Sequence, residues 1–229
     1  MSLLRFAEPH IYTPVDDSLV LWISGAGRGV GSKVFDLSRK GNHGTIYGAC
    51  WKSLPSGHSV LSFDGVDDYT FIPKSAFPGE NATLMWWVKA DFSSMDDGEV
   101  RMVCSEHSLG STCEFRTYGA VKVDFYFGNG SESRFVRFGK LPNNIWTFLA
   151  VIWSYDGMST EVKSYVNGEY RDTESTDEKI VAPDQRISLG RWHSRYFNGV
   201  IGEVRFYNRA LSAREIRELY NKTRHLYGY

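Results

Sequence analysis

The sequence lacks the features that mark several large classes of protein. Its 229 residues include 26 Lys and Arg and 27 Asp and Glu. The two signs are interspersed, so no basic surface is available for a phosphate backbone or an anionic membrane. The longest uncharged apolar runs, such as Phe148 to Trp153, are too short to span a bilayer. We therefore expect no nucleic acid among the partners of this chain and no membrane insertion.

The sequence also has few cysteines and no apolar run of the kind found in secretory signals. Cys50, Cys104 and Cys113 allow one internal bridge at most, and Cys104 with Cys113 is the only pair close in sequence. Reduced, buried thiols are the alternative. The first residues, MSLLRFAEPHIYTPVDD, contain no apolar run long enough for a secretory signal. No low-complexity linker or repeat divides the chain, so we predict an N-terminal extension, residues 1–18, and a single domain, residues 19–229.

Short strand-like segments are what the sequence has in quantity. About fourteen of them are separated by turn signals, of which Asn167-Gly168 is the clearest prediction of a two-residue hairpin. A single helix is indicated at the end of the chain, where Ser212 and Glu215 have the spacing of a capping box. The pattern predicts an all-β fold: a two-sheet antiparallel β-sandwich of the jelly-roll type with one short C-terminal helix. One sheet of such a sandwich is usually curved and leaves its concave face open for ligands.

Several motifs follow one another in a characteristic order. They are LVLW from Leu19, DLSRKGNHGT from Asp36, LSFDGVDDY from Leu61, WWVKA from Trp86, WTFLAVIWSYDG from Trp146, SYVNGE from Ser164, LGRW from Leu189 and FNGVIGEVRFYNRALS from Phe197. Over residues 19–220 this order closely resembles the laminin-G-like jelly-roll modules of the concanavalin A-like lectin/glucanase superfamily. The resemblance implies a fold shared by lectins, adhesion modules and polysaccharide-cleaving enzymes. The chain departs from it at residues 24–27 and at Gly202, where related proteins often have acidic residues.

Calcium is the cofactor that the resemblance raises, since many similar proteins bind it. The best set of oxygen ligands is Asp36 and Asn42 with the carbonyls around Gly41, completed by Glu203. The alternative is that Asp36 and Asn42 only stabilise a turn through hydrogen bonds to the backbone. The second acidic loop, residues 63–68, is interpreted as a plain turn.

Aromatic and polar side chains alternate in two places where a glycan could bind. Proteins hold neutral sugars by stacking aromatic faces on the rings and adding a few hydrogen bonds. The predicted ligand-binding residues are Trp192, His193, Arg195 and Tyr196 between two strands, and Asp124 and Tyr126 on one face of a third. The alternative for the first group is that Trp192 folds back to cover the edge of the sandwich.

Catalysis is not predicted. A glycosidase with this type of fold would place paired carboxylates at alternate positions of one strand, as E-x-D-x-E, and the sequence has no such run. We therefore predict a non-catalytic recognition or adhesion module for carbohydrate. It would be displayed on an extracellular or virion surface, in several copies as a homo-oligomer or larger assembly, with a glycan or glycosylated surface as its partner. The first alternative is a structural or decoration protein of a virion or other large assembly that uses the same sandwich for protein–protein contacts, and the second is a polysaccharide-cleaving enzyme.

Overall fold

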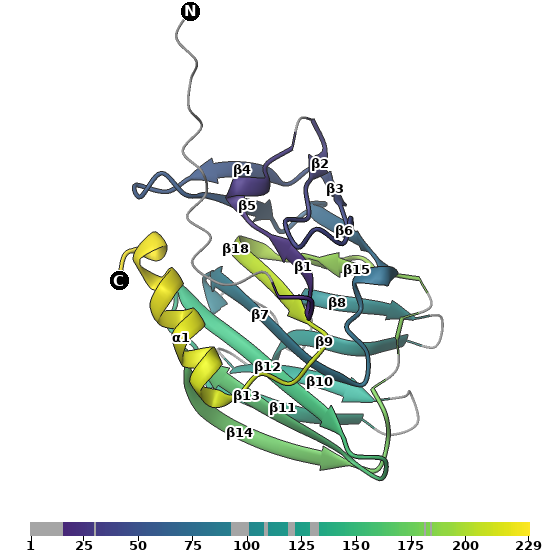
Figure 1. Ribbon diagram of the computed structural model, residues 1–229. Helices are drawn as coiled ribbons and strands as arrows, with labels where there is room; N and C mark the ends of the chain where they lie inside the picture. The colour runs from purple at the N-terminus through teal and green to yellow at the C-terminus, as the bar shows by residue number, and fades with distance from the viewer. Residues whose placement is uncertain are drawn as a thin grey trace, which may run out of the picture.

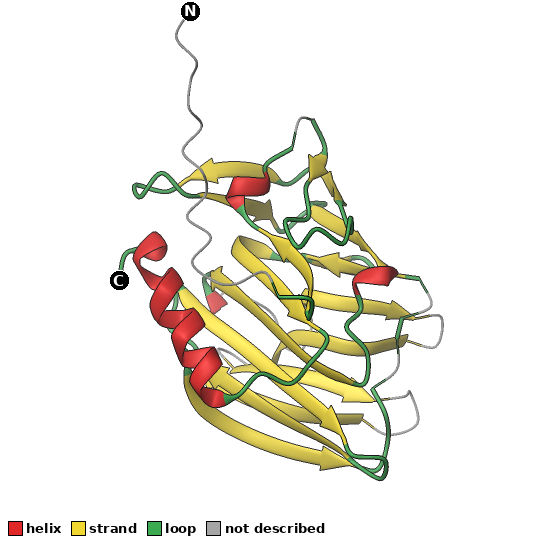
Figure 2. Cartoon of the chain, viewed as in Figure 1, coloured by secondary structure: helices red, strands yellow, loops and turns green. Residues whose placement is uncertain are grey.

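Two antiparallel sheets lie face to face, and a single α-helix packs on the outside of one of them (Figures 1 and 2). The computed structural model describes residues 16–29, 31–92, 101–107, 110–118, 122–128, 133–180, 182–183 and 185–229; within these ranges the side chains of residues 101–118, 122, 128 and 133 are not described. The predicted all-β sandwich with one short C-terminal helix is confirmed. Among the described residues, no helix combines the length and the apolar composition needed to cross a membrane.

The first sheet, sheet A, runs in the order β14 (Glu169–Thr176), β13 (Thr160–Val166), β12 (Thr147–Tyr155), β7 (Asn81–Lys89), β18 (Asn198–Tyr207), β5 (Ser59–Asp64), β4 (Cys50–Ser53), with β1 (Leu19–Ile23) beside β18. Sheet B runs in the order β11 (Ser133–Lys140), β10 (Lys122–Gly128), β9 (Gly110–Tyr118), β8 (Arg101–His107), β15 (Arg186–Leu189), β6 (Tyr69–Pro73), β3 (Gly44–Tyr47), β2 (Lys33–Val34). A small hairpin, β16 (Arg191–Trp192) and β17 (Arg195–Tyr196), follows β15. The 3-10 turns whose residues are all described are η1 (Gly25–Gly27), η2 (Lys74–Ala76) and η4 (Arg224–Tyr227).

Apolar side chains form two layers rather than one. The main core lies between the sheets and includes Trp86, Phe125 and Trp153. A second cluster, with Trp87 and Phe148, lies between sheet A and the C-terminal segment. Both faces of sheet A are therefore covered, which is why β7 and β12 consist of nearly continuous buried residues. The outer face of sheet B is the sheet surface that α1 leaves open.

The C-terminal helix α1 (Ala213–Thr223) begins where the sequence predicts. The Ser212 hydroxyl accepts the amide hydrogen of Glu215, and the Glu215 carboxylate accepts that of Ser212, which completes the capping box. Leu211 and Ile216 are both buried in the second cluster, as a hydrophobic staple requires. The helix thus turns its apolar side onto sheet A.

Several strands differ from the sequence prediction, and β2, β16 and β17 are among those that it did not include. The strand predicted for residues 169–171 continues to Thr176, because β14 pairs along most of β13. The short strand β4 was not predicted either. Its residues are mostly exposed, and its strand conformation depends on pairing with β5. The predicted hairpin at Asn167-Gly168 is confirmed, with φ of 52° and 77°. The proposed bridge between Cys104 and Cys113 involves side chains outside the described part of the chain.

Candidate functional site

The outer face of sheet B presents aromatic side chains on strands β3 and β6. Side chains alternate across a strand, and Thr70 and Ile72 of β6 are buried against the core. Tyr69 and Phe71 therefore face outward and remain half-exposed. Tyr47 of β3, which is opposite Tyr69 in the register, is 43% exposed. Aromatic surface of this kind is available to a ligand because the sheet fixes it from below.

These rings make one continuous group, which we call the aromatic platform: Tyr47, Tyr69, Phe71 and Tyr196. Tyr47 stacks on Tyr69 with ring centroids 4.6 Å apart, and its ring meets that of Phe71 at 5.4 Å. Tyr196, from the β16–β17 hairpin, lies 6.3 Å from Tyr69. The platform therefore joins two neighbouring strands to a loop that is distant in sequence.

Two guanidinium groups lie over the platform. Arg186 is 3.9 Å from the centroid of Phe71, while Arg191 is 4.7 Å from that of Tyr69 and 5.6 Å from that of Phe71. A guanidinium placed over a ring keeps its N–H groups at the edge of the contact, and Arg191 Nε there donates to the His193 carbonyl at 2.9 Å. Flat aromatic faces beside planar hydrogen-bond donors suit a sugar, whose ring has apolar faces and a hydroxylated rim.

The β16–β17 hairpin contains the first group of predicted ligand-binding residues, Trp192, His193, Arg195 and Tyr196. It is fastened to sheet B because the Ser188 hydroxyl donates to the Arg191 carbonyl at 2.7 Å. Trp192 is half-buried and meets the His193 ring edge-on at 4.5 Å. His193, with φ of 52°, stands at the exposed tip of the hairpin. Within the predicted set, the Tyr196 ring lies against Tyr69 of the platform, and Trp192, His193 and Arg195 lie on the same hairpin.

Asp124 and Tyr126 lie on the same outer face, further across the sheet. Phe125 between them is fully buried in the core, as the alternation predicts. Asp124 is opposite Arg137 on β11, and Tyr126 is opposite Phe135. The Arg137 guanidinium lies 4.8 Å from the Phe135 centroid, so this end of the face repeats the pairing of arginine with an aromatic ring. Strands β15, β8 and β9 separate β10 from β6, a distance of about 19 Å at the usual strand spacing.

Sequence reasoning missed most of the platform. Tyr47, Tyr69, Phe71 and Arg186 were not among the predicted ligand residues. The usable signal was the pattern of residues 69–73, YTFIP, in which both outward positions of a short strand are aromatic. Their meeting with Tyr47 and Arg186 depends on the pairing of β6 with β3 and β15, which no local pattern reveals.

Asp36 lies in a dense network of hydrogen bonds. Its Oδ1 accepts the amide hydrogens of Trp22 and Ser38, each at 2.9 Å, and its Oδ2 accepts the Asn42 amide at 2.9 Å and the Ser38 hydroxyl at 2.7 Å. These are the contacts that the turn alternative predicts. The third residue of the predicted calcium set, Glu203, lies on β18 with its Oε1 2.7 Å from Arg205 Nε. Calcium at Asp36, Asn42 and Glu203 stays a prediction, tested by whether calcium or a chelator moves the thermal midpoint.

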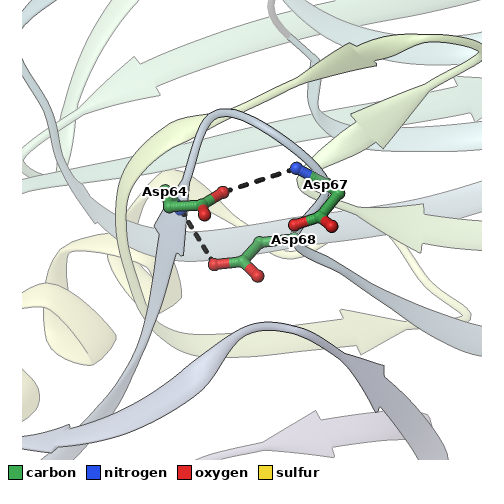
Figure 3. A group of neighbouring side chains, drawn as sticks. All are labelled: Asp64, Asp67 and Asp68. Carbon is green, nitrogen blue, oxygen red and sulfur yellow. Dashed lines mark hydrogen bonds between the residues drawn. The ribbon is translucent and has the colours of Figure 1, made fainter.

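The acidic loop between β5 and β6 brings three carboxylates together, with one oxygen each from Asp64, Asp67 and Asp68 within 4.8 Å of one another (Figure 3). Asp64 Oδ1 accepts the amide hydrogens of Val66 at 2.8 Å and Asp67 at 3.4 Å, and Asp68 Oδ2 accepts that of Asp64 at 2.9 Å. Burial, with the neighbouring charges of Asp64 and Asp67, raises the pKa of Asp68. These bonds are those of a turn, as the sequence indicates.

Comparison with known families identifies the fold. The family model described as the concanavalin A-like lectin/glucanases superfamily matches residues 64–217. The chain belongs to this superfamily. The match runs from the acidic loop to the C-terminal helix. The resemblance of its motifs to laminin-G-like modules is thus confirmed. A comparison with curated proteins gives no match.

Solved structures agree with the family. One similar structure is that of domain 4 of AbnA, a GH43 extracellular arabinanase from Geobacillus stearothermophilus, in complex with arabinotriose. The TM-score is 0.70 at 19% identity, and the match covers 89% of this chain and 98% of the arabinanase domain. The binding domain of Paraclostridial Mosquitocidal Protein 1 has a TM-score of 0.72 at 15% identity, and the match covers 91% of this chain and 53% of that domain. The receptor binding domain of botulinum neurotoxin type G gives 0.68 at 14% identity, with coverages of 90% and 51%.

These likenesses establish the fold. The superfamily member spans about half the length of the two toxin domains, whereas it spans nearly all of the arabinanase domain. The ligands of the whole toxin domains are therefore not assigned to this chain.

Proposed function

We propose that this superfamily member is a non-catalytic carbohydrate-binding module that takes its ligand on the outer face of sheet B. The observation that supports the proposal most directly is the aromatic platform with the two arginine side chains stacked on it. The arabinanase domain, which shares the fold over nearly its whole length, was solved with arabinotriose. A shallow site of stacked rings and hydrogen bonds binds one oligosaccharide at about 0.1 to 1 mM, or roughly 4 to 5.5 kcal/mol.

The ligand is expected to be an oligosaccharide rather than a single sugar. The platform lies at one end of the face, and Tyr126 with Phe135 and Arg137 lies about four strands away. At the usual strand spacing this is about 19 Å, a longer span than one sugar ring. A chain of several rings would contact both ends, so affinity should rise with the length of the oligosaccharide.

Binding without cleavage is consistent with the residues present. The sequence has no E-x-D-x-E strand, and Asp124, a carboxylate on the outer face, is 4% exposed and opposite Arg137. Retaining and inverting glycosidases both need two carboxyl groups that flank one bond. We expect no new reducing ends when polysaccharides are incubated with the protein, and their appearance would overturn this part of the proposal.

Weak single sites become useful when several act together. Linking copies raises the apparent affinity because later binding events are intramolecular. We therefore propose display of several copies, in a homo-oligomer or larger assembly, on an extracellular or virion surface that faces glycosylated partners.

The proposal is tested by glycan-array screening followed by calorimetry on the best ligand. Tyr47→Ala removes an exposed ring from the platform, and Trp192→Ala and Tyr196→Ala remove the rings of the hairpin. Stacked rings contribute about 0.5 to 1.5 kcal/mol each, so each change should weaken binding roughly two- to tenfold. Tyr170→Ala is the matched control, because Tyr170 is 52% exposed on β14 of sheet A, away from the proposed face.

Two results would contradict the proposal. One is ligand affinity that is the same in the platform variants and in the Tyr170→Ala control. The other is no binding across a broad array. A stable oligomer in light scattering, together with a silent array, would favour the structural or decoration protein instead.

A further inference from the structure

A cavity of about 240 Å³ lies on the opposite side of the molecule, between sheet A and the C-terminal turn η4. Its floor contains Trp22, Glu203 and Arg205. Its rim contains His58, Lys222 and His225, from the β4–β5 turn, the end of α1 and η4. Lys222 and His225 are exposed, so the cavity opens to solvent, whereas the floor is buried. The sugar-binding face proposed above has no part in it.

The floor holds a buried ion pair between a carboxylate and a guanidinium. Glu203 Oε1 is 2.7 Å from Arg205 Nε, and the two side chains are 3% and 4% exposed. The Arg205 guanidinium also lies 4.4 Å from the Trp22 ring centroid. Charges this deeply buried are stable only when paired. Glu203 is thus held by Arg205, and the Trp22 face that a sugar would need is already covered.

The rim adds positive charge. Floor and rim together contain two permanent cations, Arg205 and Lys222, and one carboxylate, that of Glu203. His58 and His225 add two imidazoles that become cationic on protonation. His58 Nε2 lies 3.3 Å from the Tyr227 hydroxyl, which accepts the amide hydrogen of Glu203 at 2.7 Å, so its ring is fixed at the cavity wall. The balance of charge favours an anion.

We propose that this cavity binds a small anion with carboxylate, sulfate or phosphate oxygens, held by Lys222, His225 and His58 above the Glu203–Arg205 pair. A volume of about 240 Å³ admits a small organic acid or an inorganic oxyanion and excludes a polysaccharide chain. Side chains with several donors, such as the Lys ammonium and imidazolium, give charge-assisted hydrogen bonds to such oxygens.

Binding should strengthen as the pH falls. Burial lowers the pKa of His58, while the charge of Glu203 raises it and that of His225 lowers it further. The other charged groups that face His58 across the cavity are Arg205 and Lys222. An anion in the cavity favours the protonated imidazole, so it should raise the pKa of His58 and bind more tightly when that ring is charged.

Sulfate is the first probe, because its charge does not change between about pH 6 and pH 8. We expect sulfate to raise the thermal midpoint relative to sodium chloride at equal ionic strength, with a larger rise at the lower pH. Lys222→Met and His225→Gln should each weaken sulfate binding at least about fivefold, and Lys140→Met, an exposed lysine on β11, should leave it unchanged. NMR titration of the His58 ring should show its pKa rising with sulfate.

Phosphate and succinate form the second arm and show which oxyanion the cavity prefers. The proposal is overturned if chloride stabilises as well as sulfate, or if the Lys222→Met and His225→Gln variants bind sulfate as the Lys140→Met control does. The Tyr47→Ala variant should bind sulfate normally, so failure of this site and failure of the carbohydrate site are separable.

Discussion

At the residue scale, the contact between Gly202 and Tyr227 ties the last strand to the C-terminal turn. A Cβ atom at position 202 would lie 2.6 Å from the Tyr227 ring and hydroxyl. Tyr227 is buried, and its ring stacks on Trp87 at 4.3 Å. The absence of a side chain at Gly202, one of the departures from the pattern of related proteins, therefore makes room for this tyrosine.

Gly202→Ala should destabilise the protein by about 1 to 3 kcal/mol, because the buried Tyr227 ring must shift. Urea denaturation measures the free energy of unfolding. In the double variant with Tyr227→Ala, the cost of the added methyl group should largely disappear. Strictly additive effects of the two changes would show that the contact does not matter.

His58 should make stability depend on pH. Burial holds the pKa of His58 in the folded protein below its ordinary value of about 6.5, so the unfolded chain binds the proton more tightly. This contribution is present above about pH 6.5 and is lost as the pH falls through the folded pKa. Thermal midpoints of the protein and of His58→Gln, compared from pH 8 downward without oxyanions, should converge on acidification. Parallel curves would contradict this assignment.

Residue positions could be predicted where a local rule decides them. The pair Trp86-Trp87 had to point to opposite faces of a strand, and both are fully buried, Trp86 between the sheets and Trp87 beneath the C-terminal segment. Here Trp87 Nε1 donates to the Thr223 hydroxyl at 3.0 Å. The neighbours of Tyr47 and Phe71, by contrast, come from strand pairing, which depends on contacts far apart in sequence.

At the element scale, α1 depends on a capping box whose carboxylate, that of Glu215, has a low pKa. The Arg209 guanidinium and the hydrogen bonds from Ser212 lower the pKa of Glu215 to about 2. Arg209 also pairs with Asp16 at 3.1 Å, so the same side chain links the cap to the segment before β1. The helix start was predictable because its signals lie within four residues. The link to Asp16 was not predictable, because it joins opposite ends of the chain.

Ser212→Ala should lower the free energy of unfolding by about 1 kcal/mol, since it leaves a first-turn amide without its acceptor. Chemical denaturation gives the value. Arg214→Ala, in which the exposed side chain pairs only at the helix surface, is the control and should change stability by less than about 0.5 kcal/mol. Equal effects would argue against the cap.

Glu215→Gln should flatten the acid limb of the stability curve. The carboxylate contributes stability above its pKa in the unfolded chain, which is about 4.5, and this contribution is lost as the pH falls toward about 2. Thermal midpoints measured across this range should therefore fall more steeply for the unaltered protein than for the variant. An identical slope would show that Glu215 is not stabilised in the fold.

At the scale of the whole molecule, three layers follow one another: sheet B, sheet A and the C-terminal helix (Figure 1). The two-sheet core could be predicted from strand alternation and turns. The second apolar cluster beneath the helix could not be predicted. Strands β7 and β12 are apolar on both faces, but their sequences do not show which element covers the outer face.

Residues 19–229 are proposed to unfold as one unit, since the second cluster joins sheet A to the helix. Calorimetry should show a single transition with equal calorimetric and van't Hoff enthalpies. Deletion of residues 213–229 should leave Trp87 and Phe148 exposed and give an insoluble or molten product. Two separated transitions in the intact chain would contradict the single-domain prediction.

The helical layer also fixes how the molecule can be attached to something else. Because α1 and η4 occupy the back of sheet A, a linker or label joined after Tyr229 emerges on the side away from the aromatic platform. Immobilised through that end on a sensor chip or a bead, the protein would point its sheet B surface toward the solution. Attachment through lysines, which are scattered over the surface, would give mixed orientations and a lower active fraction.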